Sequence, residues 1–189
     1  MKYRISNFTR RILRINNLII LDRDGTLNIR NEDGYILKTQ DLVIPFSLSD
    51  ELSNALINNN FFNFSLVTNQ SCINRGLIKI EDVLDISKKT LTTFLNSNDN
   101  FNYKIYICPH LPSEACRCRK PQTKLLEESI SHFNSNLNRT WFIGDSESDR
   151  LAARALGIKF FQVCLKPKEC SKIYCLHDPI SALTRILNE

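Results

Sequence analysis

The chain has 189 residues, 42% hydrophobic and 24% charged, which suits one globular domain with a real core. Its formal net charge is +5, but five basic and no acidic residues lie in the first 17 positions, so the rest is balanced at 20 against 20. This argues against a nucleic-acid-binding protein, which would spread Lys and Arg over one face. No apolar run approaches the roughly 18 residues that span a bilayer.

We therefore expect a soluble, cytoplasmic, monomeric protein with a basic extension at residues 1–17 and a single domain at residues 18–189. An organelle transit peptide is the alternative interpretation of the Arg-rich opening.

Apolar segments of strand length alternate with helical patterns along the chain. In chain order we predict strand 18–21, helix 49–58, strand 61–67, helix 80–96, strand 103–108, helix 121–133, strand 141–143, helix 148–156 and strand 159–163. This order predicts an α/β fold, a Rossmann-like three-layer α/β/α sandwich with a mostly parallel sheet. In such a fold the ligand crevice lies at the carboxyl ends of the strands.

Polar side chains follow the predicted strands at that edge. Asp22 and Asp24 come after the first strand, Thr68 after the second and Asp145 after the fourth, while Lys120 precedes a helix. If the sheet is parallel, the segments that follow strands converge. An isolated Asp-x-Asp-Gly is often only a turn, but four pieces in order at element junctions indicate a site.

These residue types suit phosphoryl transfer. Asp22 can attack phosphorus to form an aspartyl phosphate, and Asp24 can act as general acid and base. A carboxylate approaching a phosphate dianion is repelled, so a hard cation such as Mg²⁺, held also by Asp145, is expected. Lys120 and the Thr68 hydroxyl would bind the equatorial phosphoryl oxygens.

The motifs resemble those of the haloacid dehalogenase superfamily: residues 21–27 (LDRDGTL), 67–71 (VTNQS), the lysine of residues 119–121 (RKP) and residues 143–149 (IGDSESD). The resemblance covers about residues 19–163. It implies Asp22 as nucleophile, Asp24 as acid/base, and Mg²⁺ held by the Asp22 carboxylate, the Asp24 carbonyl and Asp145. Asp149 is left with two roles, in the metal shell or at a helix N-terminus.

Three cysteines and a histidine crowd together just before Lys120. The pattern C-x-H-x5-C-x-C of Cys108, His110, Cys116 and Cys118 suits a closed tetrahedral Zn²⁺ site in a reducing compartment. We expect a structural zinc that fixes the segment delivering Lys120. Buried thiols around a solvent-facing histidine are the alternative.

We call residues 108–118 the zinc loop. It resembles the corresponding loop in one branch of the superfamily, whose members have no cap domain over the active site. That branch contains heptose bisphosphate phosphatase and the phosphatase domain of histidinol phosphate phosphatase. The segment 69–76 (NQSCINRG) is similar to the heptose enzymes, which implies substrate contacts from Asn69, Ser71 and Arg75. Arg119 would bind the phosphate that is not cleaved. Cys72 stands where the heptose enzymes have glycine, which leaves the conformation of this loop open.

The expected substrate is a small phosphorylated metabolite, D-glycero-D-manno-heptose 1,7-bisphosphate cleaved at the 7-phosphate. The short zinc loop is closer to the histidinol phosphate enzyme, which remains the alternative. A polynucleotide end phosphatase and a non-catalytic binding module rank lower, the latter because the nucleophile, acid/base, lysine and metal carboxylate are all present.

Overall fold

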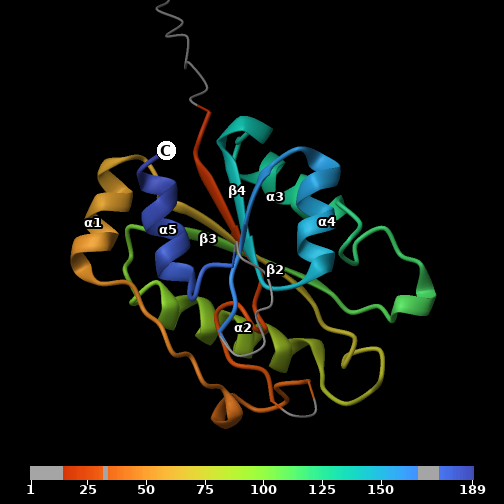
Figure 1. Ribbon diagram of the computed structural model, residues 1–189. Coiled ribbons are helices and arrows are strands. Elements are labelled where there is room, and N and C mark those ends of the chain that lie inside the picture. Colours follow the sequence, from red (N-terminus) through yellow and green to blue (C-terminus); the bar gives the residue numbers. More distant parts are fainter. Residues whose placement is uncertain (1–14, 32–33, 166–174) are drawn as a thin grey trace, which may run out of the picture.

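The structure, a computed structural model, describes residues 15–31, 34–165 and 175–189. Five parallel strands form one sheet in the order β3-β2-β1-β4-β5, with helices on both faces (Figure 1). The strands are β1 (Leu18–Leu21), β2 (Asn63–Asn69), β3 (Asn102–Cys108), β4 (Thr140–Gly144) and β5 (Lys159–Gln162). The helices are α1 (Asp50–Asn58), α2 (Ile80–Phe94), α3 (Lys124–His132), α4 (Glu147–Leu156) and α5 (Pro179–Leu187), with 3-10 turns at Thr39–Asp41, Pro112–Glu114 and Leu137–Arg139.

The predicted three-layer α/β/α sandwich is confirmed. Strand β1 is buried at every position, as expected for a central parallel strand covered on both faces. Its side chains alternate between two cores: Ile19 and Leu21 pack with residues of α1, α2 and α5, while Leu18 and Ile20 pack with residues of α3 and α4. Strand β1 therefore contacts both layers of helices, and because it is the central strand, its carboxyl end lies at the centre of the carboxyl edge of the sheet.

The helices next to the predicted site begin and end where local chemistry dictates. At the start of α4, Ser146 and Asp149 form a capping box, and Gly157 ends the helix with a φ of 71°. Helix α5 begins at Pro179 and is preceded by the N-cap residue Asp178, whose side chain accepts a hydrogen bond from Ser181 N.

Several predicted bounds were wrong by a few residues. Strand β2 begins two residues later than predicted and continues through Thr68 and Asn69, so these residues lie in the strand end itself. Helix α3 begins at Lys124 rather than Pro121, because a turn closed by Gln122 N donating to Arg119 O comes first. Helix α5 was not predicted.

The boundary at residue 17 is only partly visible. Residues 1–14 of the predicted extension lie outside the described residues. Asn16 donates from Nδ2 to Phe133 O at 2.8 Å, and Asn17 is buried with Nδ2 3.3 Å from Asn59 O, so residues 16 and 17 pack on the domain. No helix within the described ranges has the length and apolar content needed to cross a membrane.

Candidate active site and metal centres

The predicted site residues meet at the carboxyl edge of the sheet, around the point where the strand order reverses between β2, β1 and β4. Asp22 continues β1, its amide donating to Ile143 O at 3.0 Å. A cavity of about 190 Å³ opens here. Its walls include Asp22, Asp24, Arg30, Tyr35, Thr68, Asn69, Gln70, Arg119, Lys120, Ser146 and Ser148. Three strand ends and the zinc loop therefore contribute to one cavity, as the sequence predicts for a parallel sheet.

Lys120 lies at the bottom of this cavity with only 2% of its side chain exposed. Its ammonium donates hydrogen bonds to Asp22 Oδ1 at 2.6 Å and Val67 O at 2.8 Å and forms an ion pair with Asp149 Oδ1 at 2.7 Å. Burial works to lower the pKa of Lys120, but the charges of Asp149 and Asp22 outweigh it and raise that pKa. Lys120 therefore stays charged and holds Asp22 in place.

Three carboxylates converge beside the lysine. Oxygen atoms of Asp22, Asp145 and Asp149 all lie within 4.8 Å of one another. Burial raises the pKa of Asp22 to about 7, and the charges of Asp149 and Asp145 add to the effect against the opposing charge of Lys120. Burial likewise raises the pKa of Asp145 to about 6. Such a cluster favours a hard cation with oxygen ligands.

The backbone makes room for this cluster. Gly25 has a φ of 88°, and a Cβ at this position would lie 2.1 Å from Asp145 Oδ2. Gly25 N donates to Asn28 O at 2.8 Å, which closes a tight turn directly after the two aspartates. Only glycine allows the turn and the Asp145 carboxylate to approach this closely.

Asp24 is held by side chains that sequence reasoning did not assign to the site. Arg23 is fully buried and contacts both oxygens of Asp24, with Nη2 2.9 Å from Oδ2, and donates from Nη1 to Ser87 Oγ. Gln70 Nε2 donates to Asp24 Oδ2 at 2.6 Å and Asn28 Nδ2 to Oδ1 at 3.0 Å. Burial works to raise the pKa of Asp24, but the Arg23 charge and these hydrogen bonds lower it overall.

Arg30 is a second unassigned residue at the site. Its Nε donates to the backbone carbonyl of Asp24 at 2.8 Å, and Nη2 lies 3.0 Å from Asp145 Oδ1 and 2.9 Å from Oδ2. The only signal for it in the sequence is a basic residue in the polar segment after the first motif, which gives no direction for the side chain.

The other predicted substrate-binding residues are placed unequally. Thr68 lines the cavity, and its Oγ1 accepts from Gln70 Nε2 at 2.8 Å. Asn69 uses both ends of its amide on the backbone of Lys120, at 3.1 Å each. Arg119 lines the cavity and donates to His110 O.

The loop that follows β2 is less closely associated with the cavity. Ser71 lies just behind its wall, with Oγ 3.3 Å from the Tyr35 hydroxyl, whereas Arg75 is exposed and not part of the lining. Cys72 is buried and has no left-handed backbone conformation, so this loop does not require glycine there.

The four predicted zinc ligands, Cys108, His110, Cys116 and Cys118, form a compact group. Cys108 ends β3, and its Sγ lies 3.6 Å from both His110 Nδ1 and Cys116 Sγ. Cys118 Sγ lies 3.1 Å from His110 Nδ1, 3.3 Å from Cys108 Sγ and 3.4 Å from Cys116 Sγ. Tetrahedral zinc with bonds of about 2.0–2.3 Å separates its ligand atoms by roughly 3.5–3.8 Å, so small adjustments would fit an ion. Burial raises the pKa of the Cys108 and Cys118 thiols, a cost that a bound cation would offset.

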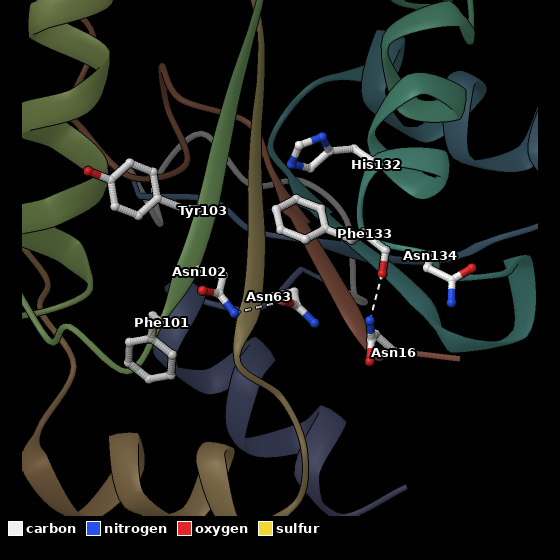
Figure 2. A pocket seen from close by; sticks show the side chains of 8 residues that line it. All are labelled: Asn16, Asn63, Phe101, Asn102, Tyr103, His132, Phe133 and Asn134. Atoms are coloured by element: carbon white, nitrogen blue, oxygen red, sulfur yellow. Dashed lines mark hydrogen bonds between the residues drawn. The ribbon is translucent and has the colours of Figure 1, made fainter. Parts of the chain in front are cut away.

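A larger cavity of about 520 Å³ lies at the opposite, amino edge of the sheet (Figure 2). Figure 2 shows asparagines and aromatic rings around it, including Asn63 at the start of β2 and Asn102 at the start of β3. Its lining contains no carboxylate, lysine or arginine; the ring of His132 packs edge-on against Phe133 at 4.8 Å. Size alone would favour this cavity, but the converging charges lie in the smaller one.

Comparison with known proteins identifies the family of the chain. The HAD-hydrolase-like family model matches residues 117–164. A D-glycero-β-D-manno-heptose-1,7-bisphosphate 7-phosphatase of Pseudomonas aeruginosa is 37% identical over 140 residues, 74% of this chain and 76% of that protein. The enzyme of the same name from Neisseria meningitidis serogroup A is 33% identical over 142 residues, 75% of this chain and 74% of that protein. The chain belongs to the haloacid dehalogenase superfamily.

Within the superfamily, the chain is a phosphatase of the heptose bisphosphate phosphatase family, as the resemblance of its motifs implied. The histidine biosynthesis bifunctional protein HisB of Campylobacter jejuni is also similar, 33% identical over 143 residues, but the match covers only 40% of that protein.

Solved structures agree with this haloacid dehalogenase fold. A D,D-heptose 1,7-bisphosphate phosphatase of B. bronchiseptica, solved with magnesium and phosphate, superposes with a TM-score of 0.71 at 24% identity, covering 91% of this chain and 98% of that one. The D,D-heptose 1,7-bisphosphate phosphatase of Burkholderia thailandensis superposes with a TM-score of 0.56 at 20% identity, covering 92% of this chain and all of that one. Between β1 and β3, the described residues form β2, α1, α2, one 3-10 turn and the loops that join them, with no lid domain among them.

Proposed function

We propose that this haloacid dehalogenase phosphatase removes the 7-phosphate from D-glycero-β-D-manno-heptose 1,7-bisphosphate. The observation that carries the proposal is the arrangement of Asp22, fixed by buried Lys120 and within 4.8 Å of Asp145, in a cavity of about 190 Å³. The substrate is favoured by relatives of that name at 33–37% identity.

In the proposed mechanism Asp22 attacks phosphorus, so that its carboxylate oxygen bonds to phosphorus while the bond to the sugar oxygen breaks. Asp24 gives its proton to the departing alkoxide. It then takes a proton from a water molecule that attacks the aspartyl phosphate, which returns Asp24 to its protonated form, while the release of inorganic phosphate restores the Asp22 carboxylate. Arg23, Gln70 and Asn28 hold Asp24 between these two proton transfers.

Magnesium fits the oxygen atoms at this site. The Asp22 and Asp145 carboxylates and the Asp24 carbonyl would hold it, and the two carboxylates, with oxygens within 4.8 Å of each other, are close enough to share an ion. Mg²⁺ prefers such oxygen ligands, and it would supply charge that lets a carboxylate approach a phosphate dianion. Asp149 would stay with Lys120 and Ser146, which it contacts at 2.7 and 2.6 Å, and so would orient the lysine.

Phosphate recognition in this proposal comes from the remaining polar groups of the cavity. Lys120 and Thr68 would contact the phosphoryl group under attack. Arg119 would bind the phosphate that stays on the sugar, because this residue lines the same cavity and its Nη1 is held by a hydrogen bond to His110 O. Asn69 would act by fixing the Lys120 backbone, and Ser71 together with Tyr35 would border the sugar, whereas Arg75 could contribute only from outside the cavity.

A structural zinc would complete the site. Cys108, His110, Cys116 and Cys118 offer three sulfurs and one nitrogen, with no open position for a substrate. The segment they enclose leads directly into Arg119 and Lys120, so zinc binding would fix the two cations that meet the phosphates.

The test is release of inorganic phosphate from a panel of phosphorylated metabolites, followed by kcat/KM for heptose 1,7-bisphosphate and histidinol phosphate. The proposal predicts a clear preference for the bisphosphate, and Asp22→Asn should abolish its turnover. Asp99→Asn, which removes the same charge at an exposed loop position, should have full activity.

A preference for histidinol phosphate would overturn the substrate in favour of the function suggested by the HisB match. Preferred release from DNA or RNA ends would favour a polynucleotide end phosphatase. No turnover of any substrate, with the fold intact, would point to a binding module.

A further inference from the structure

Arg30 uses the same oxygen atoms that the proposed function assigns to magnesium. Its Nε lies 2.8 Å from the Asp24 carbonyl oxygen, and its Nη2 lies within 3.0 Å of both carboxylate oxygens of Asp145. We propose that Arg30 is a competing cation of the active site: its guanidinium and Mg²⁺ exclude each other, so magnesium binding requires this side chain to leave.

The exclusion follows from distances and charge. Magnesium binds oxygen at about 2.0–2.1 Å in a nearly octahedral shell. A guanidinium nitrogen already 2.8–3.0 Å from the Asp24 carbonyl and the Asp145 carboxylate occupies the space of that shell, and two cations this close would repel. The inference rests on the proposed function, because it takes these oxygens as the magnesium ligands.

The backbone around Gly25 favours the contact between Arg30 and Asp145. A Cβ on Gly25 would lie 2.8 Å from Arg30 Nε as well as 2.1 Å from Asp145 Oδ2, so the glycine leaves space for the arginine and the carboxylate together. The start of the Arg30 segment is anchored, since Ile29 N donates to Val43 O at 3.0 Å and Asn28 Nδ2 donates to Ile29 O. The backbone next to Arg30 is therefore held in place, and only the Arg30 side chain has to move when it leaves Asp145.

Arg30 can nevertheless be displaced. Its side chain is 47% exposed, whereas Lys120 and Arg23, which pair with the other carboxylates, are almost completely buried. Its guanidinium can rotate into solvent or into the cavity that it lines, without breaking the backbone hydrogen bonds of Ile29. By linkage, a group that must be displaced before a ligand binds weakens the apparent affinity for that ligand. The structure thus assigns to Arg30 control over the magnesium concentration at which the site fills.

The experiment is isothermal titration calorimetry with MgCl₂ alone on protein freed of divalent cations in the active site but loaded with zinc. Arg30→Ala should bind Mg²⁺ about three- to fivefold more tightly than the native chain, the upper part of the range expected for losing a half-exposed ion pair. Arg30→Lys keeps the charge without the fork of donors and should lie between them. Arg154→Ala removes the same charge from an exposed position on α4 and should not change the affinity beyond twofold.

The outcomes separate the inference from the function on which it rests. Unchanged or weaker Mg²⁺ binding by Arg30→Ala, beside normal binding by the native chain, overturns the competition and leaves the proposed function standing. If Asp145→Asn binds Mg²⁺ as well as the native chain, the proposed ligands are wrong, and the failure belongs to the proposed function. Tighter binding in Arg30→Ala together with loss of binding in Asp145→Asn supports both.

Discussion

Gly25→Ala is the most direct test of the position of the Asp145 carboxylate, which we propose as a magnesium ligand. The φ of Gly25 is 88°, and an L-residue in this region costs about 1–2 kcal/mol. In addition, the new methyl carbon would lie 2.1 Å from Asp145 Oδ2, whereas an ordinary carbon–oxygen contact is about 3.3–3.6 Å. The carboxylate must therefore move by roughly an ångström, and a misplacement of this size can lower catalysis about 100-fold.

Gly157→Ala separates the two effects. Gly157 has a φ of 71° at the end of α4, and an added Cβ there would meet nothing within 4 Å. Both variants should lose about 1–2 kcal/mol of unfolding free energy, which lowers Tm by about 2–4 °C per kcal/mol in a chain of this size. Only Gly25→Ala should also lose Mg²⁺ affinity by calorimetry and kcat/KM by about 100-fold or more. If Gly25→Ala binds Mg²⁺ like Gly157→Ala, then Asp145 does not act where we place it.

Four further predictions concern the charges and the zinc loop. Asp22→Asn should lower kcat by at least about 1,000-fold, measured as phosphate release, with an unchanged Tm within a few degrees; substantial residual turnover would exclude a covalent aspartyl phosphate. Lys120→Ala leaves two buried carboxylates without their shared cation and should lower the unfolding free energy by about 3–5 kcal/mol in urea titrations, while a loss under 1 kcal/mol would contradict the pairing. Cys116→Ser should release the zinc, counted by metal analysis, and lower Tm, whereas Cys164→Ser should retain about one zinc per chain. The pKa values of Asp22 and Asp145 are raised to about 7 and about 6, and both carboxyl groups must be ionised to bind Mg²⁺. The Kd for Mg²⁺ should therefore rise as the pH falls from about 7 to about 5. A Kd that does not change with pH would show that both groups are already ionised over this range.

The layers of the fold were predictable because the chain alternates strand-length apolar runs with helical patterns. A run such as Leu18–Leu21 has no polar position, which is what a strand covered on both faces requires. The order of strands in the sheet was not predicted, since the pattern of one strand does not specify its neighbour. Helix α5 was missed although Asp178-Pro179 is a start signal and Ala182, Leu183 and Ile186 form its buried face.

The grouping of Asp22, Thr68 and Asp145 was predictable because each lies at the end of a strand, and the carboxyl ends of neighbouring parallel strands lie together. Several of the side chains that hold the site residues were missed. Arg23 stands between two aspartates, where a charged residue would ordinarily be expected in solvent, yet it is fully buried against Asp24 and Ser87. Arg30 and Gln70 likewise reach the site through side-chain directions that spacing does not encode.

The predicted Lys120 and the two missed cations, Arg23 and Arg30, together explain how the cluster of acids is tolerated. Each carboxylate has a positive partner: Lys120 for Asp22 and Asp149, Arg23 for Asp24, and Arg30 for Asp145. Buried charges need such partners, because an unpaired one costs several kcal/mol. Of the three cations, Lys120 and Arg23 have 2% and 0% of their side chains exposed, against 47% for Arg30. In the proposed function, a cation from solution would therefore replace Arg30 while both buried pairs stay intact, and the metal site would fill without disturbing the hydrogen bonds to Asp22 and Asp24.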